Sequence, residues 1–136
     1  MKTSIVILTL MVITCIPDLK AQTYISGYMS YIDDDGEWTE WIEENVEITI
    51  DRKSNLISIF DPVWLMHTEY KITAVGKPEQ DEDDDIATAY QCRDEKGDAW
   101  TVTVIDLVTT DPGKLQINIS NDTKSTSYHV MEAEEE

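Results

Sequence analysis

Carboxylates are the most abundant side chains in this sequence that could do chemistry, and several of them are adjacent. Asp and Glu number 28, and residues 81–85 are all acidic. Clustered carboxylate oxygens suit calcium, and the acids around Gly36 also invite comparison with a calcium loop. Aligning Gly36 with the glycine of such a loop places Tyr31 at the first ligand position and Ile42 at the last. We therefore expect residues 81–85 to form a solvated loop tip, with no cofactor and with calcium binding that is weak at most.

Side chains for nucleophilic or transition-metal chemistry are few. His67 and His129 are the 2 histidines, and neither a His-x-His or Cys-x-x-Cys spacing nor a Gly-x-Ser-x-Gly motif occurs. Cys92 ends the apolar stretch 86–92, which predicts a buried, unreactive thiol. We therefore expect no metal site and no enzyme. The enzymatic alternative is a hydrolase in which two of the acids face each other across a cleft.

Tryptophans are the second possible mark of function. The chain has 4 tryptophans and 6 tyrosines but 1 phenylalanine, which is a bias toward aromatic rings with a polar group. Such rings are common at hydrated interfaces and sugar-binding faces. In a strand, Trp38 and Trp41 would point to opposite faces, so only one of them would lie in the core. Trp64 lies in residues 61–67, a segment too apolar for an ordinary loop, which would plug a barrel or present a contact surface. Trp38, Trp41 and Trp64 are the candidate interaction residues, and the alternative for each is a plain core or lid position.

Short runs of alternating apolar and polar residues must position these side chains. Residues 46–50 show the period of a half-buried strand, with three aliphatic residues on one face. The same pattern predicts strands at residues 24–32, 38–42, 46–50, 56–60, 70–75, 86–92, 100–107, 115–119 and 126–131. Turn residues connect these runs, which predicts an all-β antiparallel meander of about eight strands, a closed barrel in preference to a sandwich. One helical turn within residues 36–45 is the competing interpretation, because its tryptophans also have helical spacing.

The N-terminal segment predicts export. Lys2 precedes an apolar run at residues 5–13 that is too short to span a bilayer, and Pro17 ends this run ahead of the small residue Ala21. We interpret residues 1–21 as a signal peptide. The new N-terminus is then Gln22, and the protein is secreted or periplasmic.

The rest of the chain predicts one β domain at residues 22–131 and an acidic disordered tail at residues 132–136. A lipoprotein signal would place its acylated cysteine at Cys15, but Ile13 and Thr14 precede it where small residues are expected. We therefore do not expect lipidation. We expect the mature chain to have no integral membrane segment and, once Cys15 is removed, no second cysteine with which Cys92 could form a disulfide.

One short motif resembles a known family. The Gly-x-Trp at residues 36–38 resembles the motif near the first strand of lipocalins, and the length and strand count suit that kind of barrel. The partner motifs of the family do not appear, because Thr-Asp at residues 110–111 is followed by Pro112 and no arginine follows Arg93. No site residue is carried over from this resemblance.

Charge narrows the choice of partners. The formal net charge of -18 excludes sequence-independent binding to nucleic-acid phosphates and disfavours binding to an anionic membrane surface. We expect a secreted, non-catalytic binding domain with an acidic surface and aromatic contact residues, whose partner is a protein or a carbohydrate. The alternatives are a small-ligand carrier barrel and an inhibitor of a basic enzyme.

Overall fold

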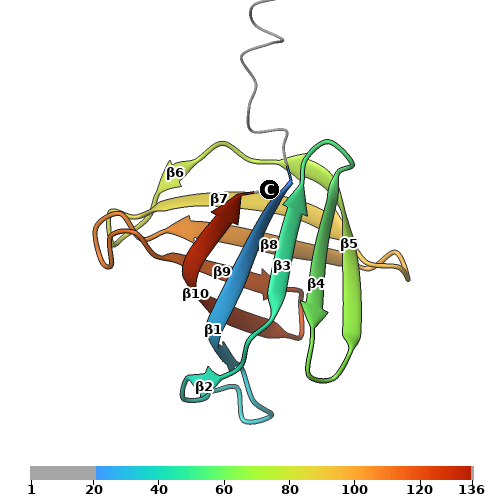
Figure 1. Ribbon diagram of the computed structural model, residues 1–136, viewed down its shortest axis with the longest axis horizontal. Helices are drawn as coiled ribbons and strands as arrows, with labels where there is room; N and C mark the ends of the chain where they lie inside the picture. Colours follow the sequence, from blue (N-terminus) through green and yellow to red (C-terminus); the bar gives the residue numbers. More distant parts are fainter. Residues whose placement is uncertain (1–20, 136) are drawn as a thin grey trace, which may run out of the picture.

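The computed structural model describes the backbone of residues 21–135 and the side chains as far as Val130. The predicted signal peptide lies outside the described residues, apart from Ala21. The described chain is built from β-strands joined by short turns (Figure 1). The strands are β1 (Gln22–Tyr31), β2 (Ile42–Glu43), β3 (Glu47–Asp51), β4 (Leu56–Asp61), β5 (Met66–Val75), β6 (Glu79–Gln80), β7 (Ile86–Arg93), β8 (Ala99–Asp106), β9 (Leu115–Ser120) and β10 (Ser125–Glu135).

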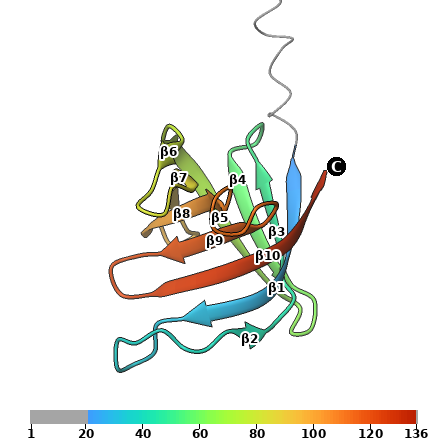
Figure 2. The same cartoon turned by 90° about the vertical axis from the view of Figure 1, so that its left-hand side faces the viewer.

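These strands form one antiparallel sheet that closes on itself. The hydrogen-bonded order is β10-β9-β8-β7-β5-β4-β3-β1, and pairing of β10 with β1 closes a barrel of 8 strands. The short strands β2 and β6 are added beside β1 and β7. Figure 2 shows β1 and β10 side by side at the closing seam, where Gln22 pairs with Glu135. The predicted all-β antiparallel barrel is confirmed in preference to the sandwich.

Alternation of side chains explains why the strands adopt this register. In the β8–β9 ladder, Val102 pairs with Ile119 and both are buried inside the barrel. The neighbouring pair, Thr103 and Asn118, points to the opposite, outer face because successive side chains in a strand alternate. A shift of one residue would expose the aliphatic side chains, so the hydrophobic pattern fixes the pairing.

Three segments differ from the prediction. The predicted strand at residues 38–42 is not formed, and neither is a helical turn. The chain turns back at residues 33–37, makes one bridge between Ile32 and Trp38, and enters a strand only at Ile42, the first residue of β2. Strand β5 begins at Met66, ahead of the predicted residue 70. Strand β10 continues to Glu135, so its pairing with β1 takes in residues 132–135 of the predicted tail. Residues 21–135 contain no helical segment with the length and hydropathy needed to cross a bilayer.

Side chains fill the inside of the barrel. Ile48, Ile57 and Ile117 have no exposed surface, and the ring of Tyr70 meets that of Trp100 edge-on at a centroid distance of 5.5 Å. A barrel of about eight strands is just wide enough for its side chains to fill. Cys92 belongs to this core, and burial raises the pKa of its thiol to about 11. The predicted buried cysteine is therefore confirmed.

Candidate functional site

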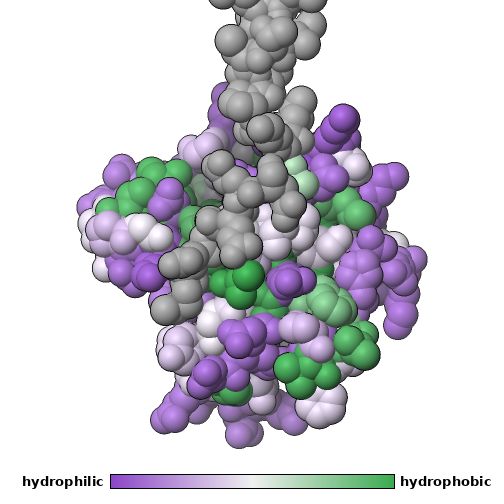
Figure 3. Space-filling model, in the orientation of Figure 1, coloured by the Kyte–Doolittle hydropathy of each residue, from purple (hydrophilic) through white to green (hydrophobic). Residues whose placement is uncertain are grey.

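The turn between β4 and β5 and the first residue of β5 carry the most exposed large apolar side chains of the described residues. Val63, Trp64, Leu65 and Met66 are 76%, 72%, 76% and 65% exposed. In Figure 3 hydrophobic surface gathers at this end of the molecule, next to hydrophilic side chains. We name residues 62–66 the β4–β5 tip. The interpretation of this segment as a plug is wrong, because Trp64 faces solvent, and its position fits a contact surface.

A single carboxylate organises this tip. Oδ1 of Asp61 accepts hydrogen bonds from the amide N–H groups of Val63 and Trp64, at 3.0 and 3.3 Å. Asp61 also pairs with Met66 at the end of the β4–β5 ladder, so both ends of the loop are held. An Asp side chain that bonds to the backbone ahead of it stabilises a tight turn. The exposed apolar side chains therefore stand on a defined backbone.

The β3–β4 turn, at the other end of β4, has the same construction with different chemistry. Oδ1 of Asp51 accepts hydrogen bonds from the amide N–H groups of Lys53 and Ser54, at 3.1 and 3.2 Å. Asp51 pairs with Leu56, which gives a loop of the same length. The residue before the returning strand is Asn55, and this turn is polar throughout. The chain thus contains a polar counterpart of the β4–β5 tip.

Leu65 adopts a backbone conformation that its side chain disfavours. Its φ is 54°, and Asn55 at the equivalent place in the β3–β4 turn has a φ of 55°. Asparagine visits this left-handed region readily, whereas other L-residues lose about 1 kcal/mol there. The cost is not recovered by burial, since Leu65 is exposed. Backbone strain of this kind is concentrated at functional sites.

Two carboxyl groups meet at the base of the β4–β5 tip. A hydrogen bond with Asp61 raises the pKa of Glu44, and burial and the charge of Asp61 add to the rise. The same hydrogen bond lowers the pKa of Asp61, which keeps its charge and continues to hold the turn. A carboxyl pair is what the hydrolase alternative needs. However, neither carboxyl lines the hollow at Trp38 and Trp41 described below or two larger hollows on the surface.

Trp38 and Trp41 lie together, away from the β4–β5 turn in the sequence. They are 52% and 50% exposed and line one hollow of about 240 Å³ on the outside of the barrel. The expectation that one of them would be in the core is wrong. Both tryptophans are exposed because residues 38–41 are not a regular strand, so the alternation of faces does not apply to them.

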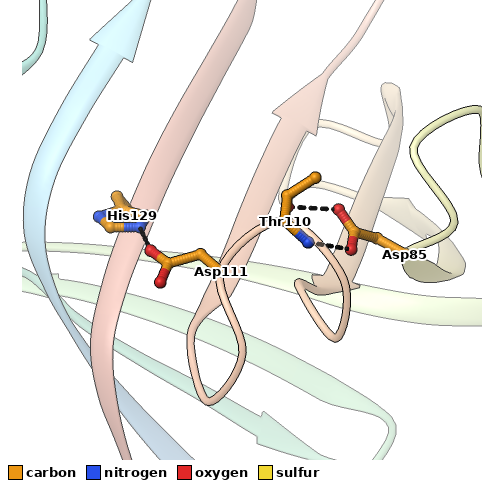
Figure 4. Close-up of polar contacts among 4 residues, drawn as sticks. All are labelled: Asp85, Thr110, Asp111 and His129. Carbon is orange, nitrogen blue, oxygen red and sulfur yellow. Dashed lines mark hydrogen bonds and ion pairs between the residues drawn. The ribbon is translucent and has the colours of Figure 1, made fainter.

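A chain of polar contacts supports Trp41 from behind. The ring of His129 lies 5.9 Å from that of Trp41, and Nε2 of His129 lies 3.7 Å from a carboxylate oxygen of Asp111 (Figure 4). Asp111 belongs to the β8–β9 loop. The neighbouring Thr110 donates its hydroxyl hydrogen to Asp85 at 2.6 Å and its amide hydrogen at 3.1 Å.

Asp85 is the one residue of the acidic run whose burial contradicts the prediction. Only 2% of its surface is exposed, although we expect the whole run 81–85 to be a solvated tip. Hydrogen bonds from the Thr110 hydroxyl and from the Thr109 and Thr110 amides lower its pKa, against the opposing effect of burial. A carboxylate can be buried when its oxygens are satisfied in this way. Asp85 therefore ties the β8–β9 loop to the barrel.

The other acidic turns use carboxylates to hold the backbone. Oδ1 of Asp33, of Asp81 and of Asp94 each accepts hydrogen bonds from the amides two and four residues further on, at 2.9 to 3.1 Å. The residue in third place after each aspartate has a positive φ, as in Gly36 and Gly97. Among the described residues, no group of three or more His, Cys, Asp or Glu side chains is arranged to hold a metal ion.

Fold and surface together define a small antiparallel β-barrel with an apolar tip at one hairpin and a tryptophan-lined hollow on its outer wall. Comparison of the chain with protein-family models, with curated proteins and with solved structures finds no match in any of the three.

Sequence reasoning selected all three tryptophans but missed the residues that position them. Glu44 and Asp85 are two acids among 28, and nothing in their immediate sequence distinguishes them. Leu65 did have a signal. The spacing of Asp51 to Asn55 is repeated by Asp61 to Leu65, which would have indicated two turns of one type with an unfavourable residue in the second.

Proposed function

We propose that this protein is an exported, non-catalytic binding domain that docks on a partner protein through the β4–β5 tip. The observation that carries the proposal is the exposure of four apolar side chains on a turn in which Leu65 is held in a strained conformation. Neither the exposed apolar surface nor the strained backbone stabilises the domain on its own. A partner that covers the tip would bury the apolar surface and offset the strain.

The shape and composition of the tip favour a concave, apolar binding pocket on the partner. Trp64 stands at the centre of the tip sequence, with Val63 and Leu65 beside it. A central tryptophan at an interface contributes about 2 kcal/mol or more to binding. The aliphatic neighbours would exclude water around it, as the residues that surround such anchors do.

Charge favours a basic border around that pocket. The chain has a net charge of -18, and Asp61 and Glu44 lie at the base of the tip. Attraction to a cationic protein acts over about 8 Å at physiological salt, which speeds association and favours partners of opposite charge. An inhibitor of a basic enzyme would be one protein of this type.

Two alternatives have less support. A carrier barrel needs a ligand space in its interior, and here core side chains occupy the interior. A hydrolase needs its carboxyl pair in a cleft, whereas Asp61 is engaged in building the turn and accepts hydrogen bonds from Val63 and Trp64.

The experiment compares wild type with a tip variant that carries Val63→Ser, Trp64→Ser and Leu65→Asn together. These substitutions leave the net charge and Asp61 unchanged, so the turn should form and the fold should remain. Each protein is immobilised and exposed to extracytoplasmic proteins of its host across a salt series. We expect wild type to retain a basic protein at physiological salt and the tip variant to lose it, with the retained amount falling as salt rises.

A control variant carries substitutions in the β3–β4 turn, the polar counterpart of the tip. The variant Lys53→Ser with Ser54→Ala changes the β3–β4 turn and should retain the partner. Equal retention by the tip variant and wild type would contradict the proposal. Binding of wild type, but not of the tip variant, to zwitterionic lipid vesicles in place of any protein would also overturn it, because the tip would then be a membrane contact.

A further inference from the structure

The hollow at Trp38 and Trp41 is separate from the β4–β5 tip and has the composition of a small-ligand site. Its volume is about 240 Å³, and its lining combines the two indole rings with Ser30, Thr39, Gln116 and Ser127. It lies where residues 38–41 fold against the outer face of β1, β9 and β10. Ligand sites usually join aromatic surface to a few placed polar groups.

The polar floor of the hollow is rigid. Gln116 donates from Nε2 to Asn118 Oδ1 at 3.1 Å and to Ser127 Oγ at 2.9 Å, while Ser127 donates to Asn118 at 2.6 Å. These side chains share the outer face of the barrel, because Asn118 pairs with Ser127 in the β9–β10 ladder. Hydrogen-bonded side chains on paired strands keep a fixed geometry for a ligand.

The aromatic walls are also held in place. The Ser30 hydroxyl donates to the carbonyl oxygen of Thr39 at 2.8 Å, which ties the segment between the two tryptophans to β1. The ring of His129 packs against Trp41, and its Nε2 lies 3.7 Å from a carboxylate oxygen of Asp111. Among the described residues, the indole N–H groups of Trp38 and Trp41 have no hydrogen-bond partner. Two ordered rings with unused donors therefore face solvent.

A saccharide ring matches this combination. One face of a pyranose is made of C–H groups that pack on an indole ring, and its edge carries hydroxyl groups that accept from indole N–H and exchange hydrogen bonds with amides and hydroxyls. The hollow is small enough to hold one sugar ring, and the other rings of a longer saccharide would extend over the surface. Acidic neighbours, Glu40 in the sequence and Asp111 behind His129, disfavour a negatively charged sugar. We propose that the hollow between Trp38 and Trp41 binds an uncharged saccharide ring.

The test uses the indole signals of the full mature protein. The chain has 4 tryptophans, so ¹⁵N-labelled protein gives one indole N–H resonance for each of Trp38, Trp41, Trp64 and Trp100. The probes are neutral tetrasaccharides of glucose, mannose, galactose and N-acetylglucosamine, with tetragalacturonate as the anionic control. We expect at least one neutral tetrasaccharide to shift the Trp38 and Trp41 signals in a saturable way, while the Trp64 and Trp100 signals stay in place and tetragalacturonate shifts none.

Variants separate this site from the proposed docking tip. Trp41→Ala should weaken the affinity by about tenfold or more, Trp41→Phe should restore part of it, and Trp64→Ala should leave it unchanged. The indole signals that remain in each variant report whether it is folded. The proposal is overturned if no neutral tetrasaccharide shifts Trp38 and Trp41, or if Trp64 and Trp100 shift equally. Either result leaves the docking proposal intact, since that proposal depends on residues 62–66.

Discussion

At the scale of single residues, Leu65 is the most informative position in the molecule. It occupies the same left-handed place in its turn that Asn55 occupies in the polar counterpart, at φ values of 54° and 55°. The same chain thus shows which residue suits the conformation and which does not. Under the proposed docking function, the side chain of Leu65 at this place would serve a contact outside the fold.

Exchange of these two residues should have opposite effects on stability. Leu65→Asn removes the strain and loses little burial, so the free energy of unfolding should rise by about 1 kcal/mol. Asn55→Leu should lower it by about the same amount. Urea denaturation of both variants and wild type measures the two changes. A fall in stability for Leu65→Asn would mean that the leucine serves the fold and that our reading of the tip is wrong.

Asp85 predicts a specific dependence of stability on pH. Its pKa in the folded protein lies below its ordinary value of 3.8, because Thr109 and Thr110 donate hydrogen bonds to it. A lowered folded pKa gives stabilisation that is present above the ordinary pKa and is lost as the pH falls through the folded pKa. Asp85→Asn should therefore be less stable than wild type by a constant amount above about pH 5, and the difference should shrink below that.

Asp83→Asn is the matched control for this measurement. It removes the same charge from the same loop, but the Asp83 side chain is exposed, so its stability should follow wild type at every pH. Denaturation midpoints at several pH values provide the comparison. If the penalty of Asp85→Asn is unchanged from neutral pH to pH 3, the carboxylate is not the group that holds the β8–β9 loop.

At the scale of elements, the acidic turns form a consistent set. Asp33, Asp81 and Asp94 each receive two amide hydrogen bonds within their own turn, and Asp94 also accepts from the indole N–H of Trp100 at 2.9 Å. The carboxylates thus replace backbone partners that a tight turn lacks. These aspartates therefore have a structural use at the ends of the hairpins.

This use predicts a weak and unselective response to divalent cations. Calcium and magnesium at equal millimolar concentrations should raise the melting temperature by small and equal amounts, because both only screen the net charge. Thermal melts with each ion and with chelator test this. A rise of several degrees with micromolar calcium alone would show a true calcium site and contradict the account of these turns.

The strands could be predicted from the sequence because alternation is a local property. Residues such as Ile48 and Ile50 repeat every second position, and burial of one face selects the register. The path of residues 38–41 and the burial of Asp85 could not be predicted in this way. The first depends on the hydrogen bond that Thr39 donates to the carbonyl of Tyr31 across the turn at residues 33–37. The second depends on Thr110, 25 residues further along the chain. The alternation of apolar and polar residues contains neither contact.

At the scale of the whole molecule, the barrel closes through the two ends of the described chain. Gln22 pairs with Glu135 at the seam, so β1 begins at the predicted mature N-terminus. Cleavage after Ala21 would leave all residues of β1 in the mature protein. Closure by β1 and β10 is thus compatible with removal of residues 1–21.

The predicted signal peptide determines which residue begins the mature protein. Protein made in its own host and collected outside the cytoplasm should begin at or next to Gln22, which N-terminal sequencing or mass spectrometry measures. The substitution Ala21→Trp, which puts a large residue before the cut, should cause the uncleaved chain to accumulate. Soluble protein that retains Met1 would contradict the prediction of a signal peptide.

The central claim is that the β4–β5 tip docks on a protein, and site-specific photo-cross-linking in the host tests it most directly. A photoreactive amino acid is placed at Val63 in the tip or at Lys53, the equivalent position of the polar counterpart turn. We predict one discrete adduct with a basic protein from position 63, which is absent from position 53 and disappears when Trp64→Ser is added. The same adducts from both positions, or no adduct from position 63, would contradict the claim.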